Sequence, residues 1–273
     1  MIPRGGSWSI GFGSTDPGPR SRNEDSFCAA PPVYIVADGM GGHAAGAAAS
    51  AAVVDAFVPL VGRGPVTPAD VAAAVERAQL NVLEVSKSVG GHSGSTLTGV
   101  VAVEHNGEPW WMVINVGDSR VYRLADGIIT QLTVDHSHVQ ELIDAGEITP
   151  AQAAVHPERN VVTRAMGDGD FSFDSWLLPV RMDEQIIVAS DGLTKVVSDA
   201  RIAEVTELAG DDAARRLVGA ALLAHTTDNV TAVVCEAIGA FTREGADPSP
   251  YKLWTDTPTD DDTTQTTRVR VWV

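Results

Sequence analysis

Cysteine is scarce in this sequence, and the chain of 273 residues contains only Cys28 and Cys235. They lie far apart in apolar surroundings, which is typical of buried thiols in a reducing compartment and leaves too few cysteines for a disulfide framework. Long apolar runs are also lacking. Residues 1–13 contain no hydrophobic segment of a signal peptide, and the longest apolar stretch, 44–61, is rich in alanine and includes Asp55. We therefore expect a cytoplasmic protein with no membrane partner.

Basic residues are few relative to acidic ones, with 19 Lys and Arg against 36 Asp and Glu, and the formal net charge is −17. Nucleic acid and acidic membranes are disfavoured as partners, because binding to phosphate groups requires a surplus of positive charge. An acidic excess is compatible with a site for divalent cations, since such sites are built from carboxylates. The apolar fraction of 44% is sufficient for a hydrophobic core.

Composition divides the chain into one folded domain and a tail. Residues 1–240 contain the apolar runs, whereas residues 241–273 are acidic and rich in Thr and Pro. The segment 255–267 is mostly Thr, Asp and Pro without any apolar period, which predicts a flexible tail. The closing residues 268–273 alternate like a strand.

Local patterns predict both strands and helices. Turn signals within residues 110–132 predict consecutive antiparallel strands. Thr67 and Pro68 are typical of an N-cap and a first helical residue. Grouped strands with helices between the groups favour an α+β fold, a four-layer α-β-β-α sandwich in which two antiparallel sheets pack face to face with helices outside each. The predicted strands are 33–37, 97–103, 110–116, 120–124, 128–132, 185–189 and 230–235, and the predicted helices are 43–59, 69–88, 138–145, 199–208 and 211–224.

Aspartate recurs where predicted strands begin or end. Asp38 and Asp191 each follow an apolar strand and precede glycine, and Asp228 comes just before a strand. Such positions can present carboxylates from distant parts of the chain to a hard cation such as Mg²⁺ or Mn²⁺. An Asp-Gly pair after a strand is also an ordinary turn, so this pattern by itself favours a metal site and simple turns about equally.

A second motif overlaps the first of these aspartates. Residues 39–44 match the G-x-G-x-x-A fingerprint of dinucleotide-binding proteins. That fingerprint requires a second parallel strand that ends in an acidic residue about 20 positions further on. A predicted helix and the polar turn at 62–65 occupy this region, which argues against a dinucleotide site.

Seven motifs, taken in order, resemble the metal-dependent protein phosphatases of type 2C, and in particular their bacterial members. The resemblance covers roughly residues 12–235 and implies a central β-sandwich flanked by helices, with the metals at one end. The motifs are RSRNED at 20–25, VADGMGGH at 36–43, GSTLT at 94–98, NVGDSR at 115–120, LTVDH at 132–136, SDG at 190–192 and DNV at 228–230.

The resemblance implies a serine/threonine protein phosphatase that hydrolyses phosphoserine and phosphothreonine with a hydroxide bridging two divalent metals, Mn²⁺ or Mg²⁺. Asp38 is similar to the carboxylate that bridges both metals, and the Gly39 carbonyl oxygen would complete the second site. Asp191 and Asp228 would hold the first metal. Asp118 resembles the ligand of a third, weaker metal in bacterial members, with an ordinary turn aspartate as the alternative.

Four further residues receive roles from the same resemblance. Arg20 stands where the family places the arginine that grips the substrate phosphate, a task for which a guanidinium fork is well shaped. Glu24 and Asp25 resemble acids that orient metal-bound waters. Asn229 would orient the turn that carries Asp228.

The general acid and the substrate specificity stay open at this stage. Met40 stands where eukaryotic relatives carry a histidine that protonates the leaving group, so His43 and a metal-bound water are the alternatives. Residues 135–166 resemble the flap beside the active site of bacterial members, and such loops tune substrate choice.

The implied partners are phosphorylated proteins, including serine/threonine kinases and their substrates, and the implied assembly is a monomer. One alternative is a catalytically weak pseudophosphatase that keeps the fold as a binding or regulatory module. A phosphatase dedicated to a single regulatory partner is another. The presence of all the ligand aspartates favours the enzyme.

Overall fold

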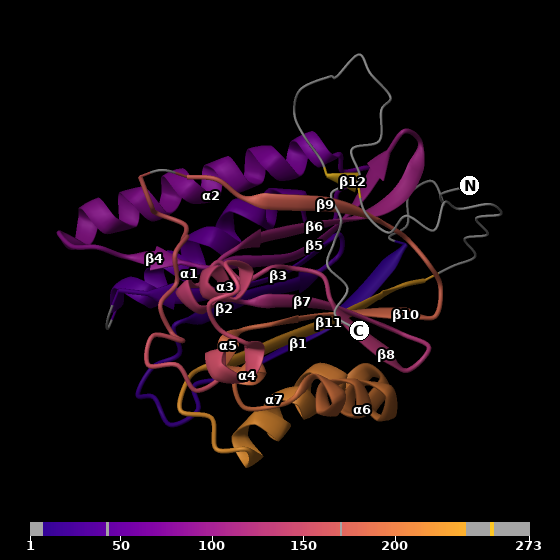
Figure 1. The fold of residues 1–273 in the computed structure, drawn as a ribbon. Helices are drawn as coiled ribbons and strands as arrows, with labels where there is room; N and C mark the ends of the chain where they lie inside the picture. The colour runs from indigo at the N-terminus through magenta and orange to yellow at the C-terminus, as the bar shows by residue number, and fades with distance from the viewer. Residues whose placement is uncertain (1–7, 42–43, 170, 239–251, 254–273) are drawn as a thin grey trace.

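The computed structural model describes residues 8–41, 44–169, 171–238 and 252–253. Two antiparallel sheets pack face to face in these ranges (Figure 1). Helices α1 (Ala44–Phe57) and α2 (Pro68–Val89) cover one sheet, and α6 (Asp199–Ala209) and α7 (Ala213–Leu223) cover the other. The predicted four-layer α-β-β-α sandwich is confirmed.

Both sheets contain only antiparallel pairs among the described strands. The first sheet has the order β1 (Ser9–Asp16), β11 (Val230–Ala237), β10 (Glu184–Ala189), β7 (Arg120–Ala125) and β8 (Ile128–Gln131). The second has the order β12 (Lys252–Leu253), β9 (Asp174–Pro179), β6 (Glu108–Val116), β5 (Leu97–His105), β3 (Val33–Met40) and β2 (Asp25–Ala30), and β4 (Gly94–Ser95) pairs with β3. Every strand predicted from the sequence is present, whereas β1, β2, β4, β9 and β12 were not expected.

The predicted helices are also present, with small changes at their ends. The predicted helix at 211–224 begins instead with a short 3-10 turn, Gly210–Asp212, before α7. Thr67 caps α2 as expected, because its hydroxyl accepts from the Asp70 N–H while the Asp70 carboxylate accepts from the Thr67 N–H. The short helices α3 (His138–Asp144), α4 (Pro150–Ala153) and α5 (Asp191–Thr194) complete the set. His43, the tail segment 255–267 and the predicted strand at 268–273 lie outside the described residues.

Three apolar layers hold the sandwich together. In β3, Tyr34 and Val36 face the opposite sheet, while Val33 and Ile35 face α1 and α2. Both faces of the strand are therefore buried, which explains its continuous apolar sequence. A third cluster packs the outer face of the first sheet against α6 and α7. Because a shift of one residue would exchange the two faces of a strand, this packing also fixes the register at the strand ends.

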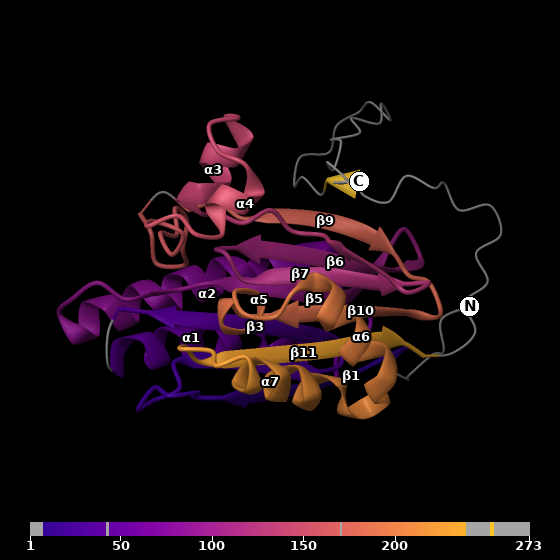
Figure 2. The same cartoon turned by 60° about the horizontal axis from the view of Figure 1, so that its bottom comes forward.

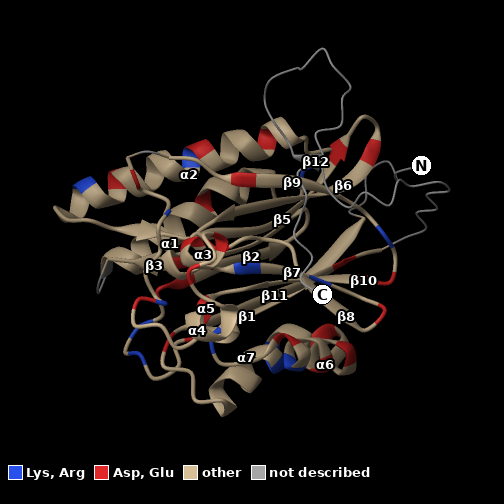
Figure 3. Ribbon diagram, viewed as in Figure 1, with Lys and Arg blue, Asp and Glu red and all other residues tan. Residues whose placement is uncertain are grey.

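Strands of both sheets begin and end at one edge of the sandwich. Strands β3, β6 and β10 end there, and β2, β7 and β11 begin there, as their antiparallel pairing requires. Helices α3 and α4 stand out from the body of the sandwich in the rotated view (Figure 2). Charged residues lie along the exposed sides of α2 and α6 and in the loops of this edge (Figure 3). None of the helices in the described part of the chain combines the length and hydropathy needed to span a bilayer.

Candidate active site

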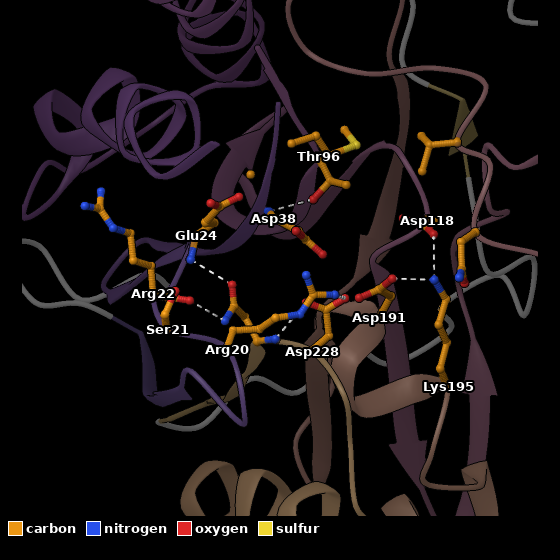
Figure 4. Close-up of a pocket in the computed structure, with 15 residues that line it drawn as sticks. Arg20, Ser21, Arg22, Glu24, Asp38, Thr96, Asp118, Asp191, Lys195 and Asp228 are labelled. Carbon is orange, nitrogen blue, oxygen red and sulfur yellow. Dashed lines mark hydrogen bonds and ion pairs between the residues drawn. The ribbon is translucent and has the colours of Figure 1, made fainter. Parts of the chain in front are cut away.

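A cavity of about 560 Å³ opens at this edge of the sandwich (Figure 4). Its walls come from the loop after β1, the end of β3, the turn between β6 and β7, the start of α5 and the turn before β11. Most of the site residues predicted from the sequence line this cavity, and Asp25 does not. Those that line it are Arg20, Glu24, Asp38, Gly39, Asp118, Asp191, Asp228 and Asn229.

Asp38 is held at the end of β3 by the neighbouring strand. Its N–H donates to Thr96 Oγ1 at 2.9 Å, and its carbonyl accepts from the Thr96 N–H at 2.8 Å. The next residue is tightly enclosed, since a Cβ on Gly39 would lie 2.1 Å from the Gly46 carbonyl oxygen. Only glycine fits at this position, which brings the backbone of β3 close to α1.

Asp191 and Asp228 come together through a close backbone contact. Asp191 begins α5 directly after β10, and Asp228 ends the turn before β11. A Cβ on Gly192 would lie 1.9 Å from the Asn229 carbonyl oxygen, so a side chain there would push the two turns apart. The glycine after Asp191 is therefore required by packing as well as by the turn.

Asn229 fastens the loop that carries Arg20. Its Nδ2 donates to the carbonyl oxygens of Pro17 at 2.9 Å and Arg22 at 2.8 Å, and its Oδ1 accepts from the Glu24 N–H at 2.8 Å. The sequence predicted that Asn229 orients the turn of Asp228, but its side-chain bonds go to the loop 17–24. Asn229 thus sets the position of the arginine relative to the aspartates.

Asp25 lies behind the cavity rather than in its wall. It is the cross-strand partner of Asp38, and its Oδ2 accepts from Ser190 Oγ at 2.9 Å and Thr231 Oγ1 at 2.7 Å. Burial raises the pKa of Asp25 to about 7 although both hydroxyl bonds lower it, and nearby acids, Asp191 among them, raise it further. No motif indicated that Ser190 and Thr231 are its hydrogen-bond partners.

Burial and nearby negative charge raise the pKa of two carboxyl groups in the wall of the cavity, those of Asp38 and Asp118. Burial raises the pKa of Asp38 well above its ordinary value, with added contributions from Asp25, Asp191, Asp118 and Asp228. Burial, then Asp191, raise the pKa of Asp118 to about 7 although Lys195 opposes the shift. Several buried acids without matching cations are costly, and a bound divalent cation would remove that cost.

Two basic side chains reach these acids. Arg20 Nη2 lies 2.9 Å from Asp228 Oδ2, but both side chains are largely exposed, 57% and 43%, so this pair contributes little stability. Lys195 bonds to Asp191 Oδ2, and its Nζ lies 3.7 Å from Asp118 Oδ2 (Figure 4). Sequence analysis missed Lys195. The available signal was its position one helical turn after Asp191.

The donor atoms suit a hard divalent cation. In the described part of the chain, no three His, Cys, Asp or Glu side chains form a ready-made metal cage, because the carboxylates of Asp191 and Asp228 are turned toward Lys195 and Arg20. Yet Asp191 Oδ1 and Asp25 Oδ1 are buried and have no hydrogen-bond partner. Buried carboxylate oxygens without a partner, in or directly behind the wall of a cavity that Gly39 also lines, fit Mg²⁺ or Mn²⁺, which bind oxygen ligands.

A second cavity of about 510 Å³ adjoins the first on the side of α3 and α4. Apolar side chains of these helices, such as Val139 and Ile143, form part of its wall. Asp118, Asp191 and Lys195 line both cavities and form the boundary between them. The segment that the sequence predicted to be a flap therefore lies beside the acidic site.

Comparison with known proteins identifies the class to which this fold and site belong. Residues 21–222 match the family model described as Protein phosphatase 2C, which is most of the chain, and the protein belongs to this family. Members of the family use divalent metals, in agreement with the carboxylate-lined cavity.

Individual relatives agree with this assignment. The chain is 34% identical over 225 residues to the serine/threonine protein phosphatase PstP of Mycobacterium tuberculosis, a match that covers 80% of this chain and 43% of the relative. It is 34% identical over 189 residues to the serine/threonine phosphatase stp of Listeria innocua, covering 64% of this chain and 71% of the relative. The chain thus spans less than half the length of the mycobacterial protein.

The fold also matches solved structures. The catalytic domain of PstP in complex with two manganese ions is similar with a TM-score of 0.77 and 32% identity, covering 85% of this chain and 99% of that chain. The similarity therefore extends over the complete catalytic domain of that protein.

Proposed function

We propose that the protein is a serine/threonine protein phosphatase that requires two divalent cations, Mn²⁺ or Mg²⁺. The observation that carries the proposal is the convergence of four aspartates, Asp38, Asp118, Asp191 and Asp228, from four separate strand ends on one cavity. Nothing in the packing of the sandwich requires four acids at one place. Their presence is explained by cations that they hold.

The proposed metal ligands are those that the family resemblance implies, and the cavity is lined by all of them. Asp38 and the Gly39 carbonyl oxygen lie at the end of β3, and Asp191 and Asp228 face them from the other sheet. Asp38 is the proposed bridge between both ions, with Gly39 at one and Asp191 and Asp228 at the other. Two bound cations would supply Lewis acidity, which lowers the pKa of water and neutralises phosphate oxygens.

Arg20 is the proposed phosphate-binding residue. Its side chain is 57% exposed, and its Nε donates to the Thr227 carbonyl oxygen at 2.9 Å, which holds the side chain over the aspartates. A cation bound by Asp228 would compete with Arg20 for that carboxylate and leave the guanidinium group free for two phosphate oxygens. An exposed arginine can reach a phosphate on a large substrate.

Three other residues position this machinery. Asn229 holds the Arg20 loop by hydrogen bonds, and the Glu24 carboxylate lies beside Gly46 of α1 at the cavity wall. Asp25 is in contact with Ser190 and Thr231, on either side of the metal-binding turns. We assign Glu24 and Asp25 to the support of metal-bound water, with Asp25 acting through its neighbours.

The proposed substrates are phosphoserine and phosphothreonine residues of other proteins. This assignment rests on the relatives, which are named serine/threonine phosphatases, and on the open, polar cavity mouth. Serine/threonine kinases and proteins that they phosphorylate are the proposed partners.

Hydrolysis of a phosphothreonine peptide tests the proposal. We expect turnover that requires added Mn²⁺ or Mg²⁺ and stops with EDTA, and a decrease of about a hundredfold or more in kcat/KM for Asp38→Asn and for Asp191→Asn. Asp55→Asn is a matched control, because Asp55 is an exposed aspartate on α1. Its kcat/KM should equal that of the wild type.

Two outcomes would contradict this function. Turnover that persists in EDTA would exclude the metal-dependent reaction. Tight Mn²⁺ binding in a calorimetric titration without turnover on any phosphopeptide would instead indicate a pseudophosphatase that retains the site as a binding module.

A further inference from the structure

Lys195 occupies the space between two carboxylates that belong to different elements. Its ammonium group bonds to Asp191 Oδ2 and lies 3.7 Å from Asp118 Oδ2. Asp191 starts α5, and Asp118 lies in the turn between β6 and β7. Lys195 therefore joins the two turns as a cation would, at the boundary of the two cavities (Figure 4).

The backbone fixes Lys195 in this place. Its N–H donates to the Asp191 carbonyl oxygen at 2.9 Å at the end of α5, so the side chain starts one helical turn from the carboxylate that it contacts. The Lys195 side chain is 33% exposed, and the Asp118 side chain is only 7% exposed. The Asp118 carboxylate is thus shielded from solvent, and Lys195 supplies a positive charge beside it.

Lys195 Nζ lies within ion-pair distance of both Asp118 and Asp191, so an additional divalent ion between these two carboxylates would lie close to both. Mg²⁺ and Mn²⁺ hold oxygen ligands at about 2.0–2.2 Å, so an ion shared by both carboxylates would require the space that Lys195 Nζ occupies. The ammonium group would also repel it. One position cannot hold both cations.

We propose that Lys195 is a built-in cation that takes the place of a third divalent ion between Asp118 and Asp191. The sequence motif around Asp118 implied a third, weaker metal site, and the structure places a lysine there. The inference rests on the proposed two-ion phosphatase. It adds that the protein works with two ions, and that Lys195 sets this number.

Mn²⁺ titration of the metal-free full chain tests the proposal without relying on activity. Bound and free Mn²⁺ are measured by electron paramagnetic resonance, and affinities by calorimetry. We expect two ions for the wild type and for Lys195→Arg, which keeps the charge. In Lys195→Gln a third ion should bind with a Kd lower than in the wild type by roughly tenfold or more, and in Lys195→Glu the third ion should bind more tightly still.

Two controls identify the site and the cause. Asp118→Asn added to Lys195→Gln should remove the third ion, because one of its ligands is lost. Lys87→Gln removes an exposed lysine that pairs with Glu84 at 2.6 Å on α2, and it should leave the stoichiometry at two. Far-UV circular dichroism establishes that each variant is folded.

Several outcomes would overturn the proposal. The first is a wild type that binds three ions, with a third affinity that does not change in Lys195→Gln. The second is a stoichiometry of two ions in both Lys195→Gln and Lys195→Glu. The third is an equal gain in affinity for the third ion in Lys195→Gln and Lys195→Glu, because a purely steric block depends on the size of the side chain rather than on its charge. If the wild type still hydrolyses phosphopeptide in a Mn²⁺-dependent reaction in any of these cases, only the role of Lys195 fails. A wild type that binds no Mn²⁺ contradicts the proposed function as well.

Discussion

Asn229→Asp should weaken the attachment of the Arg20 loop while changing almost no volume. The side chain is buried, with 6% exposed, and its Nδ2 is the donor to the carbonyl oxygens of Pro17 and Arg22. An ionised carboxylate keeps the bond from the Glu24 N–H but presents an oxygen to both carbonyls. Two hydrogen bonds are lost, and two acceptors face a negative charge.

The size of the effect can be worked from these contacts. An unsatisfied buried acceptor costs about 1–3 kcal/mol. Because the loop is partly open to solvent, we expect the two lost hydrogen bonds together to lower the free energy of unfolding by about 2–4 kcal/mol. This corresponds to a decrease of roughly 5–15 °C in melting temperature for a domain of this size. KM for a phosphopeptide should rise more than kcat falls, since Arg20 binds the phosphate.

Differential scanning calorimetry of the metal-free variant provides the assay, and pH provides an internal check. The introduced carboxyl is buried among acceptors, so its folded-state pKa should lie above its unfolded value. Such a carboxyl destabilises the folded protein least at pH values below its pKa in the unfolded chain. The destabilisation grows as pH rises through its pKa in the folded protein. The loss relative to wild type should therefore be smaller at about pH 5 than at about pH 8.

Asn81→Asp is a suitable control, because Asn81 Nδ2 makes a single bond of 3.3 Å to the Ala52 carbonyl oxygen. Its melting temperature should change much less. If Asn229→Asp melts like the wild type at about pH 8 and its KM is unchanged, the loop is not held by this amide, and the reasoning is wrong.

Two further predictions concern stability. Burial raises the pKa of Asp25 from an ordinary value of 3.8 to about 7, so the folded metal-free protein holds this proton more tightly than the unfolded chain does. The stability that this proton contributes is lost as pH rises between these two values, and Asp25→Asn should therefore flatten the decline in melting temperature over that range. An unchanged slope would contradict this. Thr67→Ala removes the hydroxyl that accepts from the Asp70 N–H at 3.3 Å, and it should lower the free energy of unfolding, measured by urea denaturation, by about 1 kcal/mol without changing kcat/KM. A loss of activity would instead show that the structure at the start of α2 affects the site.

The buried central strands could be predicted from the sequence because their residues are apolar and β-branched throughout. The first strand, β1, could not be predicted in this way. β1 contains Gly11 and Gly13, and a Cβ at either would lie within 3 Å of Tyr34 or Phe27 side-chain atoms, at 2.5 and 2.2 Å. Glycine is required there by long-range packing, but in the sequence it indicates a turn.

The strands β2 and β9 were missed for a related reason. β2 starts with Asp25, an acid that is buried only because Ser190 and Thr231 bond to it from the other sheet. Both partners are more than 160 positions away in the chain. β9 starts with Asp174 and ends with proline, which are typical of loops.

The aspartates that line the cavity could be located from the sequence, because they stand in short motifs at strand ends. Motifs do not specify which side chains neutralise these acids. Lys195 looks like an ordinary surface lysine until α5 places it between Asp118 and Asp191. The role of Asn229 was likewise hidden, since its bonds cross more than 200 positions of sequence to Pro17 and Arg22.

The pairing of β1 with β11 means that the site is complete only after β11 has been synthesised. These strands come from opposite ends of the folded region and run side by side, with Asp16 opposite Val230. The loop that bears Arg20 follows β1, and Asp228 precedes β11. A nascent chain that has not yet released β11 from the ribosome presents Arg20 but lacks Asn229, which anchors the Arg20 loop, and the proposed metal ligand Asp228. We expect ribosome-bound chains to acquire phosphatase activity only after that strand emerges.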